Sequence, residues 1–326
     1  MKKKTVSIMV AATMALSLFA GCGSSKDTAT EDTSKTESTE TTDESSENAS
    51  AETTDESSRT TFTVGFDAEY PPYGYMDDDG EYTGFDLELA QAVCDKEGWE
   101  LVKKPINWDS KDMELNSGSI DCIWNGFTIN GREDDYTWSD PYLNNEQVMV
   151  VAADSGIEKL DDLAGKNVVV QAASAALDAL NSDDNKDLTA SFASLTENPD
   201  YNTAFMNLDS GAADAIAVDI GVAKYQLSQR EEGKYVILDE PIQSEQYGIG
   251  FKKGNDELKD TVWEEVLKLY DAGEVDKLAE KYEVADMLCI GDDEKSDDKK
   301  DDAAEDDASD ADTAKEDTAD TAKDAE

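Results

Sequence analysis

Histidine is absent from this 326-residue sequence, and its absence removes several kinds of chemistry. Without histidine, a Ser-His-Asp triad, a Cys-His nucleophile and histidine-rich zinc sites are all excluded. Cysteine is scarce as well, since apart from Cys22 the chain has only Cys94, Cys122 and Cys289. Three cysteines cannot all pair within one chain, and their spacing indicates neither a disulfide framework nor a metal site. We therefore expect no metal and no cofactor.

Positive charge is also in short supply. The formal net charge is −49, and the arginines are Arg59, Arg132 and Arg230. A surface of this sign repels phosphate backbones, so the composition argues against nucleic acid as a partner. Arg132 is notable because it follows a Gly/Asn-rich stretch in "WNGFTINGRED", residues 124–134.

Long apolar runs are missing except at the start of the chain. Lys2, Lys3 and Lys4 precede an apolar run over residues 6–20, which is short for a transmembrane helix. The run ends in "LFAGC", which resembles a bacterial lipoprotein cleavage box with Cys22 as the lipid-carrying residue. We expect residues 1–21 to be a lipoprotein signal peptide. The alternative is an ordinary secretory signal followed by an incidental cysteine.

Two segments lack aromatic residues and are strongly acidic. Residues 22–60 are rich in Ser, Thr, Glu and Asp, and residues 292–326 are rich in Asp, Lys and Ala. Such compositions bury too little apolar surface to offset the entropy of folding. We expect a disordered tether of roughly 35 Å typical reach before the fold and a disordered, solvating tail after it.

The central segment, residues 61–291, alternates strand-like and helix-like patterns. The β-branched run 62–66 and the apolar runs 120–126 and 148–152 predict strands, and residues 85–97 predict an amphipathic helix. The alternation predicts an α/β fold of mostly parallel sheets flanked by helices. In such sheets ligands bind beyond the carboxyl ends of the strands.

The segments at these strand ends contain the groups that a free amino acid requires. An arginine can hold a carboxylate in a bidentate fork, an aspartate can accept bonds from an ammonium, and aromatic faces can sandwich a side chain. The residues are Asp67, Tyr70, Trp108, Asn125, Thr128, Arg132, Ser174 and Asp219.

Several blocks of sequence together resemble one family. They are "VGFDAEYPPYGYM", "GFDLELAQAVC", "IDCIWNGFTINGREDDYTWSDPY", "GKNVVVQAASAAL", "GAADAIAVDIGVAKY" and "YGIGFKKGN". In this order and spacing they are similar to the polar amino-acid-binding proteins of bacterial ABC importers, which are solute-binding proteins of family 3.

The resemblance implies the two-lobed periplasmic-binding-protein fold of the second type, with two hinge crossings and lobes that close over a ligand. It places lobe 1 at residues 61–149 plus 245–291 and lobe 2 at residues 150–244. It further implies a monomer that delivers a free amino acid to an ABC permease with its ATPase, and that is held at the extracytoplasmic face of the membrane by lipid on Cys22.

The resemblance also implies roles for individual residues. Arg132 corresponds to the arginine that holds the ligand α-carboxylate, and Asp219 to the aspartate that holds the α-ammonium. By the same resemblance, the Gly126 carbonyl and the Thr128 hydroxyl assist Asp219, and amides near Thr128 and Ser174 assist Arg132. Tyr70 and Trp108 sandwich the ligand side chain. Asp67 makes a polar contact with that side chain, and Gln171 contributes a contact from the second lobe.

The chain departs from the commonest family pattern at two places. The loop between Ile129 and Arg132 is one residue shorter, and alanines stand at Ala173 and Ala175, where relatives often carry glycine and a hydroxyl. The first departure leaves open the direction in which Arg132 points.

Other interpretations of the same residues remain open at this point. Arg132 beside "EDD" can form a surface ion pair, Tyr70 and Trp108 can be core residues, and Asp219 can cap the following helix. A dehydratase-like enzyme on the same scaffold would need Asp67 or Glu69 as its acid or base. The ectodomain of a sensor is a third possibility.

The candidate loops also bear on the nature of the ligand. They contain Asp67 and Glu69 and no lysine, which favours a neutral polar, cationic or cystine-like amino acid over glutamate or aspartate.

Overall fold

The computed structural model describes residues 59–291. The predicted signal peptide and lipid-carrying Cys22, nearly all of the predicted tether and the predicted acidic tail lie outside the described residues. Arg59, which the sequence assigns to the tether, forms an ion pair of 3.0 Å with Asp121 and lies over the ring of Trp99. Among the described residues, no helix combines the length and apolarity needed to cross a membrane.

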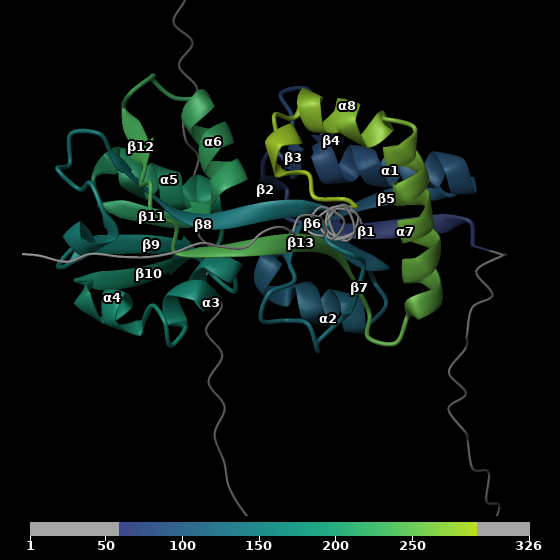
Figure 1. Ribbon diagram of the computed structural model, residues 1–326, viewed down its shortest axis with the longest axis horizontal. Coiled ribbons are helices and arrows are strands. Elements are labelled where there is room, and N and C mark those ends of the chain that lie inside the picture. Colours follow the sequence, from purple (N-terminus) through teal and green to yellow (C-terminus); the bar gives the residue numbers. More distant parts are fainter. Residues whose placement is uncertain (1–58, 292–326) are drawn as a thin grey trace, which may run out of the picture. The chain divides into compact units, whose positions relative to one another are not determined.

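Strands and helices alternate along the chain as the sequence predicts (Figure 1). The strands are β1 (Thr61–Phe66), β2 (Glu69–Tyr70), β3 (Gly74–Met76), β4 (Tyr82–Thr83), β5 (Glu100–Pro105), β6 (Cys122–Thr128), β7 (Thr137–Trp138), β8 (Leu143–Ala152), β9 (Asn167–Gln171), β10 (Ser194–Asn198), β11 (Ala215–Asp219), β12 (Tyr235–Ile237) and β13 (Gln243–Phe251). The α-helices are α1 (Phe85–Glu97), α2 (Lys111–Asn116), α3 (Ala175–Asn181), α4 (Lys186–Ser191), α5 (Tyr201–Ser210), α6 (Ile220–Ser228), α7 (Asp256–Asp271) and α8 (Glu274–Lys281). Short 3₁₀ turns are η2 (Trp108–Ser110), η3 (Leu160–Leu163) and η4 (Ala285–Met287).

One mixed sheet runs through the described residues in the order β10-β9-β11-β8-β13-β6-β1-β5. In the first lobe β1 pairs in parallel with β5 and β6, and in the second β9 pairs in parallel with β10 and β11. The two longer strands, β8 and β13, are antiparallel to their neighbours. Each lobe therefore has a parallel centre, as predicted, and an antiparallel strand that joins it to the other lobe.

The chain crosses between the lobes along β8 and β13, which run side by side in Figure 1. Residues 143–147 of β8 pair with residues 243–247 of β13, and we call this segment the crossing pair. Farther along, β8 pairs with β11 of lobe 2 and β13 pairs with β6 of lobe 1. The lobe limits proposed from the sequence fall inside these two strands.

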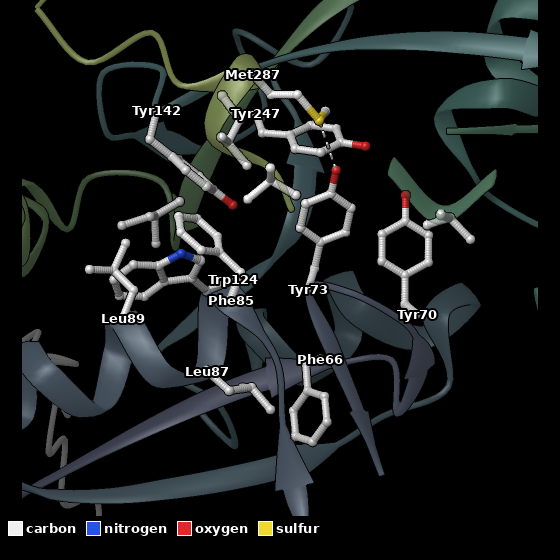
Figure 2. Packing of buried hydrophobic residues seen from close by; sticks show 14 of the residues in the cluster. Phe66, Tyr70, Tyr73, Phe85, Leu87, Leu89, Trp124, Tyr142, Tyr247 and Met287 are labelled. Carbon is white, nitrogen blue, oxygen red and sulfur yellow. Dashed lines mark hydrogen bonds between the residues drawn. The ribbon is translucent and has the colours of Figure 1, made fainter. Parts of the chain in front are cut away.

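The largest apolar core reaches from α1 through the crossing pair to α5 and is rich in aromatic side chains (Figure 2). Tyr73 lies at its centre, where its ring meets that of Tyr247 edge to face with centroids 5.3 Å apart, and its hydroxyl points toward the sulfur of Met287. Tyr70, on the side of lobe 2, contacts the ring of Tyr201 from α5. Apolar packing therefore holds the two lobes together in the observed arrangement.

Candidate ligand-binding site

A narrow cavity lies between the lobes where β6, β9 and β11 end. Its lining consists of Tyr70, Trp108, Asn125, Gly126, Thr128, Arg132, Gln171, Ser174, Ala175 and Asp219. The space between these side chains amounts to about 270 Å³, and very little of it is wide enough for a water molecule. Nine of the ten residues predicted for the ligand site therefore share one cavity, and the lobes must part before a ligand can enter it.

Strand β6 supplies the first wall. It continues through Thr128, two residues beyond the predicted end, so Asn125, Gly126 and Thr128 belong to a strand and not to a loop. Gly126 has φ of 56°, and a β-carbon there would lie 3.0–3.1 Å from the rings of three tyrosines. Its N–H donates to Oδ2 of the fully buried Asp86 at 2.6 Å. Only glycine suits this position, because both the backbone conformation and the available space exclude a side chain.

Arg132 turns toward the cavity in spite of the short loop before it. Its N–H donates to the carbonyl of Ile129, and its own carbonyl accepts from Trp138 Nε1 at 3.0 Å. The guanidinium lies over the ring of Phe127 and forms an ion pair of 2.6 Å with Asp178 of α3, across the cleft. Its ion-pair partner among the described residues is thus Asp178, which is itself exposed, and a pair with the acids that directly follow Arg132 is not observed.

A buried cation, Lys111, lies on α2 beside the partly buried Arg132 and was not predicted from the sequence. Only 5% of its surface is exposed, and its Nζ donates to the carbonyl of Ala173 in lobe 2 at 3.2 Å. Burial, reinforced by the nearby Arg132, lowers the pKa of the Lys111 ammonium. Its sequence neighbours, "WDSKDMEL", are typical of an exposed amphipathic helix and therefore offered no signal.

Asp219, the last residue of β11, is 2% exposed and lies among neutral hydrogen-bond donors. Its Oδ1 accepts from Tyr247 Oη at 2.5 Å, Gln147 Nε2 at 2.7 Å and Asn145 Nδ2 at 2.8 Å. Its side chain makes no capping bond to α6, so the helix-cap alternative is wrong. Burial raises the pKa of Asp219, while the hydrogen bonds from Tyr247 and the amides act in the opposite direction.

A second buried carboxyl group, Glu245, accompanies Asp219 and was also not predicted. Its Oε1 accepts at 2.8 Å from each of three side chains: Thr128 Oγ1, Asn145 Nδ2 and Gln147 Nε2. Burial and the charge of Asp219 raise the pKa of Glu245 to about 7. The only signal in the sequence was the alternation of polar residues along the crossing pair, which is equally typical of a strand that faces solvent.

Asp67 does not line the narrow cavity but stands behind Gln171. The amide Nε2 of Gln171 donates to Asp67 Oδ2 at 2.6 Å and so joins the two lobes. The backbone N–H of Glu69 donates to the other oxygen of Asp67 at 2.9 Å. Burial, with a smaller effect from Asp200, raises the pKa of Asp67.

A second, more open pocket lies beyond Asp67 and has acidic walls. Asp67, Glu69, Glu114 and Asp200 line it together with Trp108, and it measures about 830 Å³ between atoms. Burial and the charge of Asp200 raise the pKa of Glu69. Four carboxyl groups therefore gather in a pocket that shares Trp108 with the narrow cavity.

Ser174 and Ala173 shape the turn between β9 and α3. The Ser174 hydroxyl donates to the carbonyl of Gln171 at 2.8 Å and accepts from the N–H of Leu177 at 3.2 Å, which makes it the N-cap of α3. Ala173 has φ of 54°, a left-handed conformation that favours glycine. The turn thus keeps the conformation that a glycine would allow, although an alanine stands there.

The comparisons with known proteins agree with this geometry. A family model of bacterial extracellular solute-binding proteins, family 3, matches residues 62–285. The L-cystine-binding protein TcyJ of Escherichia coli (strain K12) is 30% identical over 232 residues, which are 70% of this chain and 85% of that protein.

Solved structures show the same two-lobed fold. An ABC uptake transporter substrate-binding protein from Streptococcus pneumoniae with bound histidine is 30% identical with a TM-score of 0.66, covering 68% of this chain and 92% of that one. The ancestral amino acid-binding protein AncCDT-1, a precursor of cyclohexadienyl dehydratase, is 30% identical with a TM-score of 0.62, covering 68% and 95%. Since the family model spans well over half of the sequence, this chain belongs to the bacterial extracellular solute-binding proteins of family 3.

Proposed function

We propose that this protein captures a free amino acid between its closing lobes and delivers it to an ABC permease. The observation that carries the proposal is the presence of one guanidinium, Arg132, and one buried carboxyl group, Asp219, in the same cavity. An α-amino acid presents one carboxylate and one ammonium, and each finds its complement there. The names of the relatives, which include cystine- and histidine-bound proteins, support this assignment.

Each lining residue has a role in this proposal. Arg132 holds the α-carboxylate, helped by amides near Thr128 and Ser174, and Asp219 holds the α-ammonium, helped by the Gly126 carbonyl and the Thr128 hydroxyl. The other residues surround the ligand side chain, with Tyr70 and Trp108 on its two faces and Asn125, Gln171 and Asp67 as polar contacts.

The acidic walls beyond the cavity narrow the class of ligand. A side chain that passes Trp108 enters the pocket lined by Asp67, Glu69 and Asp200, where a second carboxylate would be repelled. A cationic side chain, or the second ammonium of a cystine-like ligand, is attracted there. We therefore infer a neutral polar, cationic or cystine-like ligand and not glutamate or aspartate.

The location and partners follow from the same family assignment. We infer that the protein acts as a monomer at the extracytoplasmic face of the membrane, anchored by lipid on Cys22 and presented to a permease with its ATPase. Labelling with a lipid precursor tests the anchor, because Cys22→Ala should abolish incorporation of the label, and incorporation that persists would contradict it.

A thermal-shift screen of the twenty amino acids plus cystine tests the function. A specific ligand at about 100 times its Kd should stabilise the protein by about 2.7 kcal/mol. Arg132→Ala should abolish the thermal shift because the α-carboxylate of the ligand loses its bidentate partner. Arg230→Ala is the matched control, since Arg230 pairs with Asp209 away from the cavity and its loss should leave the shift in place. No shift with any amino acid in the wild-type protein would contradict the proposal.

An enzyme remains a second candidate, because AncCDT-1 is described as the precursor of a dehydratase. Asp67 and Glu69 line the open pocket and have raised pKa values, so either can act as a general acid there. Mass spectrometry of the ligand after prolonged incubation with the protein distinguishes the two functions. We expect unchanged ligand, and a dehydrated product that Asp67→Asn prevents would favour the enzyme.

A further inference from the structure

Asp219 and Glu245 share their hydrogen-bond donors in a way that makes them one unit. Asn145 Nδ2 donates to Asp219 Oδ1 and to Glu245 Oε1, both at 2.8 Å. Gln147 Nε2 donates to the same two oxygens at 2.7 and 2.8 Å. Two carboxyl groups that share two amide nitrogens cannot both be ionised without strong mutual repulsion.

Every group that surrounds this pair in the hydrogen-bond network is neutral. The outer donors are Thr128 Oγ1 and Gln243 Nε2, which bond Glu245, and Tyr247 Oη, which bonds Asp219. Burial, and after it the charge of Asp219 with a smaller effect from Glu245, raises the pKa of the phenols of Tyr73, Tyr201 and Tyr247, which therefore stay protonated. Hydrogen bonds alone thus hold a pair of acids that are 2% and 4% exposed. A buried pair of this kind keeps a proton until a cation arrives.

The pair also connects two separate spaces across the crossing pair of strands. Asp219 lines the narrow cavity between the lobes. Glu245 lines a different pocket of about 920 Å³, which we call the back pocket, between the crossing pair, α6 and η4. The charged side chains that face Glu245 there are Glu146 of β8, Lys224 of α6 and Asp286 of η4. Lys224 forms an ion pair of 3.1 Å with Asp286, so the cation of this pocket already has a partner.

We propose that Asp219 and Glu245 together form the ammonium subsite, and that Glu245 holds a proton which leaves through the back pocket when the ligand's ammonium binds. The ligand arrives with its ammonium already charged. The O–H bond of Glu245 breaks, the electron pair stays on the carboxylate, and the proton passes to water. The pair gains one negative charge and the ligand supplies one positive charge, so the buried site remains balanced.

The inference rests on the proposed function and predicts that ligand affinity increases as the pH rises toward 7. Burial and Asp219 raise the pKa of Glu245 to about 7 in the structure described here, and a bound ammonium lowers it. Below pH 7, ligand binding must therefore displace a proton. As the pH rises from 5.5 to 6.5, the Kd should fall by up to about tenfold for each pH unit, and it should level off above pH 7.5.

Titration calorimetry with L-arginine and L-cystine tests this inference, because the α-ammonium groups of both ligands stay protonated at pH 6.5 and below. At pH 6.5, in buffers of different ionisation enthalpy, the wild-type protein should release a fraction of one proton for each ligand bound. Glu245→Gln keeps an oxygen for the three donors and should abolish this release and the dependence of the Kd on pH. Glu146→Gln, an acid of the same pocket outside the hydrogen-bond network, is the matched control and should release protons like the wild type.

Each outcome separates this inference from the proposed function. Binding without proton release in the wild type, or release that persists in Glu245→Gln, overturns the role of Glu245 and leaves amino-acid capture standing. A purely structural role would weaken binding in Glu245→Gln equally at every pH. A ligand-free carbon-13 NMR titration gives a separate readout, since a glutamate Cδ signal that titrates near pH 7 should be absent from Glu245→Gln, whereas the aspartate Cγ signal of Asp86 should titrate in both proteins. If the wild type has no such glutamate signal, the inference is wrong. Failure of every amino acid to bind overturns both.

Discussion

At the scale of single residues, backbone conformation explains which positions tolerate change. Gly126 must be glycine because of its φ of 56° and the tyrosine rings around it, and its N–H is held by Asp86. Ala173 has almost the same φ, 54°, but retains a β-carbon that this conformation disfavours. Gly126 adopts the left-handed conformation without strain, whereas Ala173 adopts it with strain in the turn between β9 and α3.

Replacement of Ala173 by glycine should therefore stabilise the protein. Removal of the β-carbon relieves the left-handed strain, and we expect the free energy of unfolding to rise by about 0.5–1 kcal/mol. Urea denaturation measures the change. Ala172→Gly is the matched control, because Ala172 is not in the left-handed region and its replacement only adds freedom to the unfolded chain. A loss of stability in both variants would show that Ala173 is not strained.

At the scale of elements, strand and helix periodicity located most of the candidate site from sequence. The apolar run 120–126 predicted β6, and the residues at the carboxyl ends of β6, β9 and β11 converge on one cavity. Local sequence did not show that β6 extends to Thr128, because that extension depends on pairing with Tyr247 of β13, more than a hundred residues away. It also missed Glu245, whose polar face is buried only because the two crossing strands bring their polar faces together beneath Asp219.

Helix α6 meets lobe 1 at a position where only glycine fits. A β-carbon at Gly221 would lie 2.1 Å from Tyr73 Oη and 2.9 Å from its Cζ. We expect Gly221→Ala to hold α6 away from lobe 1 and to weaken ligand binding by about tenfold or more, because each lost 1.4 kcal/mol of closure is a factor of ten. Calorimetry measures the affinity, and small-angle scattering should show a larger radius of gyration with ligand present.

The hydroxyl of Tyr73 provides the control for this change. Tyr73→Phe alone loses a weak contact to Met287 and an interaction of the hydroxyl with Tyr247, and its affinity is the reference for the double variant. Combined with Gly221→Ala it removes the closest clash, so the double variant should regain part of the lost affinity. If the double variant binds no better than Gly221→Ala, the effect is not a contact between the lobes.

At the scale of the whole molecule, negative charge is spread over the chain while several carboxyl groups are buried. The formal net charge is −49, and burial raises the pKa of four carboxyl groups at the cleft and crossing pair: Asp67, Asp86, Asp219 and Glu245. For Asp86 and Glu245 the value is about 7. In the unfolded chain these groups release their protons near pH 4. The folded protein therefore keeps protons between about pH 4 and 7 that the unfolded chain has lost.

This difference fixes the sign of the dependence of stability on pH. Because the native state binds more protons than the unfolded state in this range, the free energy of unfolding should fall as pH rises from about 4.5 to 7 and should level off above it. We expect urea denaturation to give a free energy of unfolding about 1–3 kcal/mol lower at pH 7.5 than at pH 5.5. Asp86→Asn should reduce the difference, since Asp86 contributes a large share of it.

Repulsion among exposed acids also makes the protein less stable as the pH rises. Salt distinguishes this effect from the effect of the buried carboxyl groups. Sodium chloride at 1 M shortens the screening length to about 3 Å, so it should raise the stability at pH 7.5 by suppressing repulsion among exposed acids. Salt ions do not screen the buried carboxyl groups of Asp86 and Glu245. The part of the pH 5.5 to 7.5 difference in the free energy of unfolding that comes from these two groups should therefore persist at 1 M sodium chloride. If the difference disappears in salt, surface repulsion alone accounts for it, and the buried carboxyl groups do not change their ionisation between pH 5.5 and 7.5.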